Sequence, residues 1–500
     1  MANKSNRQRN LAGGGSKVTR RGVLQGGSAL AAAALPTGKA IGAQPVGPAM
    51  AALSNYNYMS GARERVLPAD VIEKVKHHVL DTFAAMVSGS ELVPGRAAFR
   101  FVRDYGGERV ATVVASDLLC GPIEAALANG VLAHADETDD SHAPSLSHPG
   151  CAVVPAALAL AERHGISGAH FLRAVALGYD VGPRVTMCLG IPALSREWHK
   201  SSHSIAGVFG AAAAAGCAAG LDLQQMRWLI DYTAQQSSGI AAWQRDSDHI
   251  EKAFVFGGMP ARSGVTAAVL VGSGWTGIDD ILSGPDNFLL AYSPNADAAR
   301  LTEQLGERYE VMRTNIKKWS VGSPIQAPLD ALELLLRRRR FAADEVQKVV
   351  VRLGTREASV VNNRDIPDIC LQHLVAVMLI DGTVSFHAAH DVARMQDASV
   401  LRQRGKVELA GDRELERRAP RREAIVTVAL SDGSELSEHV QAVRGTSDNP
   451  MPRSEVVTKC RDLMAPVLGA EKCEALIDRV LAIESTANMR ELRPLLQRPL

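Results

Sequence analysis

The spacing of apolar residues predicts helices along the first half of the chain. Between Pro68 and Ser88, apolar side chains recur with a period of about 3.6 residues, which places them on one face of an α-helix. Pro68 suits the first turn of such a helix, and Gly89 suits the position just past its end. The same periodicity predicts further helices over residues 122–134, 152–164, 168–187, 204–218, 223–239 and 260–273.

The pattern changes after about residue 315. Partly alternating stretches rich in β-branched residues predict strands over 346–353, 406–409, 424–430 and, beyond a hairpin turn at Asp432–Gly433, 435–440. A helix is expected before these strands, over 330–338, and an exposed loop is expected over 413–423. Helical periodicity then resumes over 454–463 and 474–483.

These elements predict a mainly α fold. A large all-helical domain, residues 46–312 plus 446–500, is expected to be interrupted by a smaller α+β lid domain, residues 313–445. Hydrophobic residues make up 46% of the chain and aromatic residues only 4%, which suits closely packed helices of small side chains. The uncharged stretch Ile205–Leu221 consists mostly of alanine and glycine, which favours a buried core helix over a membrane span.

Residues 1–43 are expected to be a targeting segment. Basic residues precede the run Thr19-Arg20-Arg21-Gly22-Val23-Leu24, and the uncharged stretch 25–37 follows it. Adjacent arginines before a short, weakly apolar segment are typical of a twin-arginine signal peptide, and small residues near Ala43 suit cleavage there. The prediction is therefore a periplasmic protein that is exported in the folded state. A disordered basic tail is the alternative.

Charge and cysteine usage argue against several classes of function. Lysine plus arginine (55) nearly balance aspartate plus glutamate (54), so no overall positive field exists to hold nucleic acid, and none is expected as a partner. The seven cysteines are scattered and form no C-x-x-C pair. This spacing disfavours a disulfide framework, a zinc ribbon and an iron–sulfur cluster.

The densest polar cluster follows the predicted helix 122–134. Four carboxylates and three imidazoles fall within the fifteen residues from His134 to His148. Carboxylates this close together repel one another, and burying them beside imidazoles shifts their pKa values. Such clusters occur mainly where a functional site uses the shifted groups, so we expect a functional site here. The alternatives are a solvated acidic loop in which Asp140 or Ser141 caps a helix, and a metal site with histidine and aspartate ligands.

Three other segments carry complementary polar groups. They contain His199, Lys200, Ser201 and His203 ahead of the uncharged helix, Lys252 and Arg262 within 249–264, and Lys317 within 316–324. The N-terminal N–H groups of the uncharged helix could also bind a carboxylate. A lone lysine or arginine is usually a surface residue, so the last two segments matter only as counter-charges to the acidic cluster.

Three motifs together point to a known family. They are N-G-x-x-x-H with D-D-S-H-x(5)-H-P in residues 129–149, G-x-F-G-A-A-A-A-A-G in 207–216, and K-x(4)-G-x-x-x-A-x-x-G in 252–264. They resemble the MmgE/PrpD family, the 2-methylcitrate dehydratase group, over residues 50–485. The resemblance implies an all-helical domain with a smaller α+β lid, a homodimer, no metal or organic cofactor, and a small polycarboxylate as the substrate.

The resemblance also implies roles for individual residues. In the acidic loop, Asp139, Asp140 and Ser141 match the family's D-D-T motif, His148 matches its H-P histidine, and Glu137 stands where aspartate is commoner. Lys252 and Lys317 match the family's two lysines. His203, or else His199 or Ser201, matches its H-x-T loop. Two departures are Val255, where a histidine is frequent, and Trp319–Gly322 in the K-x-Y-P segment. Both fall on the expected substrate-reading face, which leaves the substrate open.

We therefore predict a cofactor-independent lyase that dehydrates a small hydroxy-polycarboxylate resembling 2-methylcitrate. The expected catalytic residues are His148, His203, Asp140, Glu137, Ser141 and Asp139, and the expected substrate-binding residues are Lys252, Lys317, Arg262, His199 and His142. The cations would neutralise the substrate carboxylates, and His148 or His203 would take the carbon-bound proton. Asp140 or Glu137 would orient that histidine or protonate the leaving hydroxyl. A decarboxylase or epimerase on a related acid and a non-catalytic periplasmic binder of an anionic metabolite are the alternatives.

Overall fold

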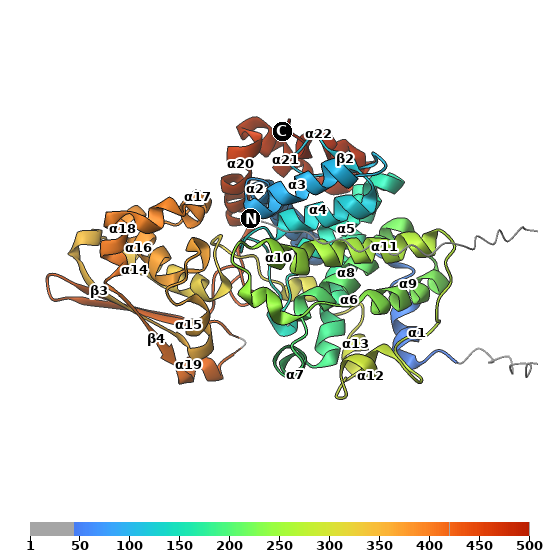
Figure 1. Cartoon of the computed structure of the whole chain (residues 1–500), viewed down its shortest axis with the longest axis horizontal. Helices are drawn as coiled ribbons and strands as arrows, with labels where there is room; N and C mark the ends of the chain where they lie inside the picture. The colour runs from blue at the N-terminus through green and yellow to red at the C-terminus, as the bar shows by residue number, and fades with distance from the viewer. Residues whose placement is uncertain (1–44, 420, 500) are drawn as a thin grey trace, which may run out of the picture. The chain divides into compact units, whose positions relative to one another are not determined.

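The structure, a computed structural model, describes residues 45–419 and 421–499. The chain from Val46 onward forms one unit, and the predicted signal peptide, residues 1–43, lies outside the described residues. Helices dominate the fold, and the larger of two β-sheets lies in the second half of the chain (Figure 1). The predicted mainly α class is therefore confirmed.

Helix α8 (Ser202–Ala219) lies inside the helical half of the chain, where it contacts α5, α6, α9 and α11. The predicted amphipathic helices are found close to their expected bounds. The helices are α1 (Pro48–Ser54), α2 (Ala69–Gly89), α3 (Val93–Tyr105), α4 (Pro122–Ala133), α5 (Gly150–His164), α6 (Gly168–Leu189), α7 (Ile191–Arg196), α9 (Leu223–Gln236), α10 (Ile250–Ala253), α11 (Met259–Gly272), α12 (Phe288–Tyr292) and α13 (Ala299–Thr302).

Small residues let α8 approach its neighbours closely. A Cβ atom on Gly178 of α6 would lie 2.6 Å from the carbonyl oxygen of Gly210 on α8, and a Cβ atom on Gly210 would lie 2.8 Å from the carbonyl oxygen of Gly178. Both distances are too short for a side chain, so the crossing of these two helices requires glycine on each side. This close packing fixes α8, whose N-terminus carries His203.

Among the residues that the structure describes, two segments are long and apolar enough to span a membrane by length and composition, Ser202–Ala219 and Ile250–Gly272. Within the protein, 89% of the most apolar window of the first and 67% of that of the second are buried. The uncharged stretch that begins at Ile205 therefore forms a core helix of this fold, as its alanine and glycine content predicts.

The second half of the chain contains a four-stranded sheet in the order β4-β3-β5-β6. Its strands are β3 (Val346–Gly354), β4 (Val407–Asp412), β5 (Ala424–Leu430) and β6 (Glu435–Val440). Strand β5 is antiparallel to both neighbours and alternates between buried and partly exposed residues, whereas β3 and β4 are parallel. A parallel pair needs a long crossover, and helices α15 (Thr355–Val361), α16 (Leu371–Asp381), α17 (Phe386–His390) and α18 (Ala398–Arg404) lie within it.

Two details of this half differ from the prediction. The expected loop 413–423 begins with a short helix, α19 (Arg413–Arg417), because the Asp412 carboxylate accepts the backbone N–H groups of Glu414 and Leu415 at 2.7 and 3.2 Å. The helix expected over 330–338 begins earlier, since α14 covers Gln326–Arg338.

The first half of the chain contains a two-stranded sheet that was not predicted. It is formed by β1 (Ala111–Thr112) and β2 (Leu119–Cys120), and two-residue strands are too short to show alternating apolar and polar residues.

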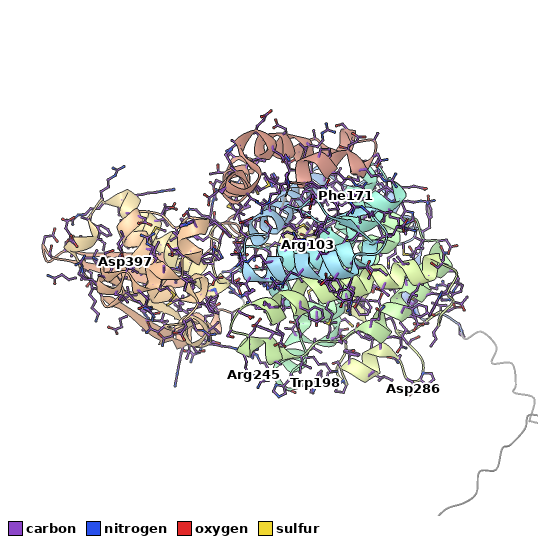
Figure 2. All side chains as sticks on the ribbon, turned by 45° about the horizontal axis from the view of Figure 1, so that its top comes forward. Arg103, Phe171, Trp198, Arg245, Asp286 and Asp397 are labelled. Carbon is purple, nitrogen blue, oxygen red and sulfur yellow. The ribbon has the colours of Figure 1, made fainter. Side chains whose placement is uncertain are left out.

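The unit has two hydrophobic cores. One is formed by residues between Met50 and Ile316 and between Met451 and Leu496, and includes the fully buried Phe171 (Figure 2); the other is formed by residues between Trp319 and Val443. We call these parts the helical part and the α+β module. The C-terminal helices α20 (Arg453–Leu468) and α21 (Ala470–Leu481) return to pack on α2, and α22 covers Arg493–Leu496. The exact domain boundaries stay a prediction.

Candidate functional site

The acidic loop that follows α4 is buried. The residues Asp136, Glu137, Asp139 and Asp140 are each at most 6% exposed. Carboxylates are almost never fully buried unless they are paired, and each of these four has a specific partner in the structure. The alternative of a solvated acidic loop is therefore wrong.

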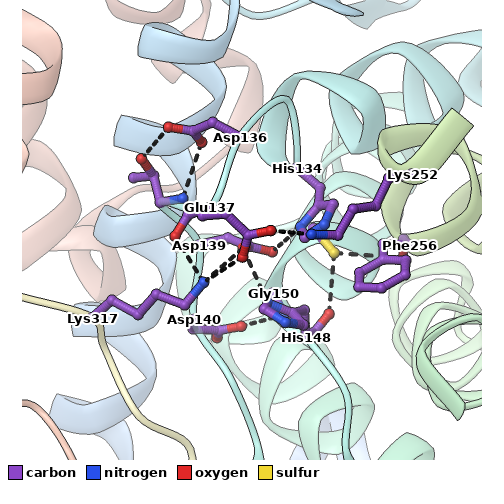
Figure 3. Close-up of polar contacts among 12 residues, drawn as sticks. His134, Asp136, Glu137, Asp139, Asp140, His148, Gly150, Lys252, Phe256 and Lys317 are labelled. Atoms are coloured by element: carbon purple, nitrogen blue, oxygen red, sulfur yellow. Dashed lines mark hydrogen bonds and ion pairs between the residues drawn. The ribbon is translucent and has the colours of Figure 1, made fainter. Parts of the chain in front are cut away.

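Asp139 holds two imidazoles at once (Figure 3). Its Oδ2 accepts the Nδ1–H of His134 at 2.8 Å, and its Oδ1 accepts the Nδ1–H of His148 at 3.0 Å. Burial opposes ionisation of this carboxyl, but the two imidazoles outweigh burial and hold the pKa of Asp139 well below its usual range. Both rings are thereby fixed as the Nδ1–H tautomer, which leaves each Nε2 available as a base or a proton carrier.

Glu137 lies between the two lysines that the family motif singles out. Its Oε1 pairs with the Nζ of Lys252 on α10, and its Oε2 lies 3.4 Å from the Nζ of Lys317, which also donates to the Glu137 carbonyl oxygen at 2.7 Å. Burial would raise the pKa of Glu137, but Lys252 and Lys317 together lower it well below its usual range. Lys252 and Lys317 lie in segments far apart in the sequence, so the Glu137 carboxylate holds these two segments together at the site.

An aromatic stack surrounds the imidazoles. His203, at the start of α8, stacks on Phe256 with 3.8 Å between ring centroids, and His134 stacks on the same ring at 4.5 Å. Phe256 lies in a π-helical turn, Phe254–Gly258, a rare element that often occurs at functional sites. Burial and the neighbouring His148 hold the pKa of His203 well below its usual value, so this imidazole is neutral.

His249 is the fourth imidazole of the cluster. Its ring centroid lies 5.4 Å from that of His134, and its backbone adopts a left-handed conformation with φ of 65°. Burial, followed by the charge of Lys252, lowers the pKa of His249 to about 3. Four imidazoles thus share one small volume next to two ammonium groups.

Asp140 faces away from this cluster. Its Oδ2 accepts the Nδ1–H of His78 at 2.8 Å and the hydroxyl of Tyr179 at 2.6 Å, and its Oδ1 accepts the N–H of Gly150 at 3.0 Å. These contacts tie α2, α6 and the start of α5 together. The orientation of His148, which we expected from Asp140 or Glu137, is therefore provided by Asp139.

A cavity of about 350 Å³ opens onto this cluster. Its lining includes the imidazoles of His148 and His203, the ammonium of Lys317, and Ser141 and His142. The ring of His142 is held at both nitrogens, by Ser145 at 2.7 Å and Glu310 at 3.1 Å, so it supports the wall of the cavity. The backbone of Ser141 bridges to Asn315, which fixes its position in the same wall.

Lys252 pairs with Glu137 but is not among the residues that line the cavity, and two other expected binding residues lie farther away. Arg262 is on α11 and is not among the residues that line the cavity. His199 is exposed and lines a second hollow of about 520 Å³, together with Arg196, Arg245 and Arg356. Figure 2 shows Arg245 at the periphery of the helical part. The side chains of Arg262 and His199 are not placed to touch a molecule held between His148 and Lys317.

The site also contains residues that the sequence did not single out as site residues. His134, His249, Phe256 and Trp243, whose indole meets the Phe256 ring edge-on at 4.7 Å, belong to this set. His134 and His249 stood inside segments that were noticed for their charge, and the spacing of His134 from Asp139 was the available signal. The two aromatic residues left no signal in the sequence.

One group of side chains in the described residues has the spacing of metal ligands. One ligand atom from each of His134, Asp139 and His148 lies within 4.8 Å of the others. The two Nδ1 atoms and the carboxylate are already committed to one another, so a cation would have to displace these hydrogen bonds. All seven cysteines are free and buried, and none of them belongs to this group.

Comparison with known proteins identifies the family. Residues 56–301 match the model of the MmgE/PrpD N-terminal domain, and residues 319–483 match that of the MmgE/PrpD C-terminal domain. The chain belongs to the MmgE/PrpD family. The resemblance seen in the motifs is therefore confirmed.

Curated relatives extend over most of the chain. The cis-aconitate decarboxylase-like protein oryM of Aspergillus oryzae is 26% identical over 88% of this chain and 96% of its own length. The cis-aconitate decarboxylases of Aspergillus terreus and Homo sapiens are 24% and 25% identical, over 87% and 86% of this chain and 93% and 91% of their own lengths. These relatives support a lyase in general, and they agree better with the decarboxylase alternative than with a dehydratase.

Proposed function

We propose that this protein is a cofactor-independent decarboxylase of a small polycarboxylate, with cis-aconitate as the first candidate. The observation that carries the proposal is the cavity on the His148–His203 pair. Its lining includes five cationic side chains, Arg313, Lys317, Arg421, Arg422 and Arg444, and among its described lining residues Asp448 alone is a carboxylate. Its volume lies in the range of about 300 to 1,000 Å³ that is usual for small-molecule sites.

The charges of the site suit an anion with several carboxylates. Lys252 and Lys317 are balanced by the ionised Glu137, and two of the lining arginines, Arg421 and Arg422, come from the α+β module. A bound polycarboxylate would therefore meet ammonium, imidazole and guanidinium groups in one cavity. Negative charge next to an imidazole raises its pKa, so the substrate itself would favour protonation of His203.

Decarboxylation would use the ammonium and imidazole groups at successive steps. The bond between a carbon atom and its carboxylate breaks, CO₂ leaves, and the electron pair stays on that carbon and spreads into a neighbouring unsaturated carboxylate. The ammonium of Lys317, which lines the cavity, stabilises the negative charge that develops on this carboxylate. An imidazolium from the His148–His203 pair then donates a proton to carbon, and the ring regains its proton from solvent.

Incubation with cis-aconitate, citrate and 2-methylcitrate, followed by ¹³C NMR, tests the proposal. We expect one CO₂ for each cis-aconitate consumed and, in D₂O, one deuteron on the product carbon. Replacing His148 by alanine should lower kcat by about 10²- to 10⁴-fold, because proton transfer by a positioned side chain contributes about that much. The matched control is His164→Ala, an exposed histidine at the end of α5.

Other outcomes of the same experiments would support one of the alternatives. Loss of water from citrate or 2-methylcitrate without CO₂ would identify a dehydratase, and tight binding without turnover would identify a binding protein. Full activity of the His148→Ala variant would remove His148 from the mechanism.

Export and assembly are also proposals. The Arg20-Arg21 pair and the uncharged stretch after it support transport by the twin-arginine route to the periplasm. In a bacterial host, the full chain should appear in the periplasmic fraction, and an Arg20→Lys, Arg21→Lys variant should stay in the cytoplasm. Equal export of the wild-type chain and the variant would contradict the proposal.

The proposed homodimer is tested by light scattering on the purified protein.

A further inference from the structure

His390 connects the α+β module to the loop that carries the site. It is the last residue of α17, its side chain is 14% exposed, and its Nε2 lies 2.9 Å from Oδ2 of Asp136 in the loop after α4. The same Nε2 lies 3.9 Å from Oδ2 of Asp368, which belongs to the α+β module. One imidazole therefore stands between a carboxylate of each part of the protein.

The contacts of the ring determine its protonation. Nδ1 lies 2.8 Å from the carbonyl oxygen of Phe386, which can only accept a hydrogen bond, and Nε2 faces the two carboxylates. Only the imidazolium form has a donor at both nitrogens. Burial alone would lower the pKa of His390, but Asp136 and then Asp368 outweigh burial and raise it to about 9.

Asp136 in turn shapes the loop at the residue next to Glu137. Its Oδ1 accepts the backbone N–H of Thr138 at 3.0 Å, and its Oδ2 accepts the Thr138 hydroxyl at 2.5 Å. The carbonyl oxygen of Thr138 accepts the Nζ of Lys459 from α20 at 3.0 Å. Glu137, which pairs with both Lys252 and Lys317, is thus held between two anchored residues.

We propose that His390 is a positioning residue, whose positive charge clamps Asp136 to the α+β module and thereby fixes Glu137 between Lys252 and Lys317. It touches neither the cavity lining nor the imidazole cluster, so it acts through Asp136. The role deepens the proposed function, and its activity readout rests on that function. Its effect on the loop can be measured without any substrate.

The charged groups around α17 predict the direction of the pH dependence. His390 faces Asp136 from the site loop and Asp368 from its own module, Lys459 of α20 lies beyond Thr138, and Asp462 of α20 accepts the backbone N–H of Phe386 at 3.3 Å. Because the pKa of about 9 in the folded protein lies above the ordinary value of about 6.5, the stability that the charged His390 contributes is fully present below pH 6.5. It is lost as the pH rises through about 9.

The test compares His390→Gln with His390→Lys and with His387→Gln, an exposed histidine on the same helix. Glutamine keeps a polar side chain but removes the charge. We expect His390→Gln to lower kcat about 10- to 100-fold with little change in KM, since small displacements of a positioned group cost about that much. Hydrogen exchange should accelerate in residues 134–141 alone, and His390→Lys should restore part of kcat.

A titration of the histidine ¹³Cε1–H signals in the wild-type protein completes the test. We expect the signal that disappears in His390→Gln to titrate with a pKa above 8. Exchange in residues 134–141, corrected for the intrinsic rise of amide exchange with pH, should increase over the same pH range. Unchanged kcat and unchanged exchange in His390→Gln would overturn the proposal. So would a uniform rise in exchange along the chain, which would mean that His390 only stabilises the fold. If the wild-type protein decarboxylates nothing, the proposed function fails, while exchange and titration still decide the role of His390.

Discussion

Replacing Asp139 by asparagine should lower kcat by about three to four orders of magnitude, as in other enzymes in which a buried aspartate fixes the tautomer of a catalytic histidine. The Asp139 carboxylate accepts the Nδ1–H of both His134 and His148, at 2.8 and 3.0 Å. An asparagine offers one carbonyl oxygen and one donating amide, so at least one imidazole would have to turn its tautomer or lose its partner. The measurement is steady-state kinetics with cis-aconitate, together with circular dichroism to verify folding.

Asp140→Asn is the matched control for this prediction, because the neighbouring carboxylate serves the fold. It binds His78, Tyr179 and the N–H of Gly150 and does not contact the imidazole cluster. We expect a lower Tm, since each buried group left without a partner costs about 1 to 3 kcal/mol, and a much smaller loss of kcat in the fraction that folds. An Asp139→Asn variant that loses only stability, like Asp140→Asn, would contradict the assignment.

The helices that the sequence predicted are of two kinds. In α2 the apolar residues recur with the helical period, whereas α5 and α8 are buried along almost their whole length and are rich in alanine. Helix α16 was missed because its residues from Leu371 to Leu379 are all buried and mostly large and apolar, so they show neither a polar face nor a run of alanine and glycine. Helix α19 was missed because a single capping aspartate, and no apolar stripe, holds it.

The site could be predicted in part. Motif spacing identified Glu137, Asp139, His148, His203, Lys252 and Lys317, which the structure brings together. It could not distinguish Asp139 from Asp140, because adjacent residues of an irregular loop can point to opposite sides, and only the fold decides which one meets the imidazoles. It also could not find His390, which reaches Asp136 from a distant helix of the other core.

The second large effect is expected for Lys317→Met. Lys317 is buried, and its Nζ lies 2.7 Å from the Glu137 carbonyl oxygen, 3.4 Å from the Glu137 carboxylate and 3.9 Å from the Asp139 carboxylate. Methionine preserves much of the apolar stem but removes the charge, so these two buried carboxylates lose a cation and the substrate loses a counter-ion. Truncating one partner of a buried charged pair costs about 2 to 5 kcal/mol, which corresponds to a fall of kcat/KM by about 30- to 4,000-fold.

The neighbouring residue provides the control for the Lys317→Met variant. Lys318 pairs with Glu333 at 2.5 Å and does not line the cavity, so Lys318→Met should leave kcat/KM within about twofold, as is usual for a partly exposed pair. Calorimetry with tricarballylate, a tricarboxylate without a double bond, measures binding apart from chemistry. If Lys317 binds the substrate equally in the ground state and the transition state, the loss of binding will equal the loss of kcat/KM. A larger loss of kcat/KM would mean that Lys317 stabilises mainly the charge that develops as CO₂ leaves, and equal kinetics in both lysine variants would show that Lys317 does neither.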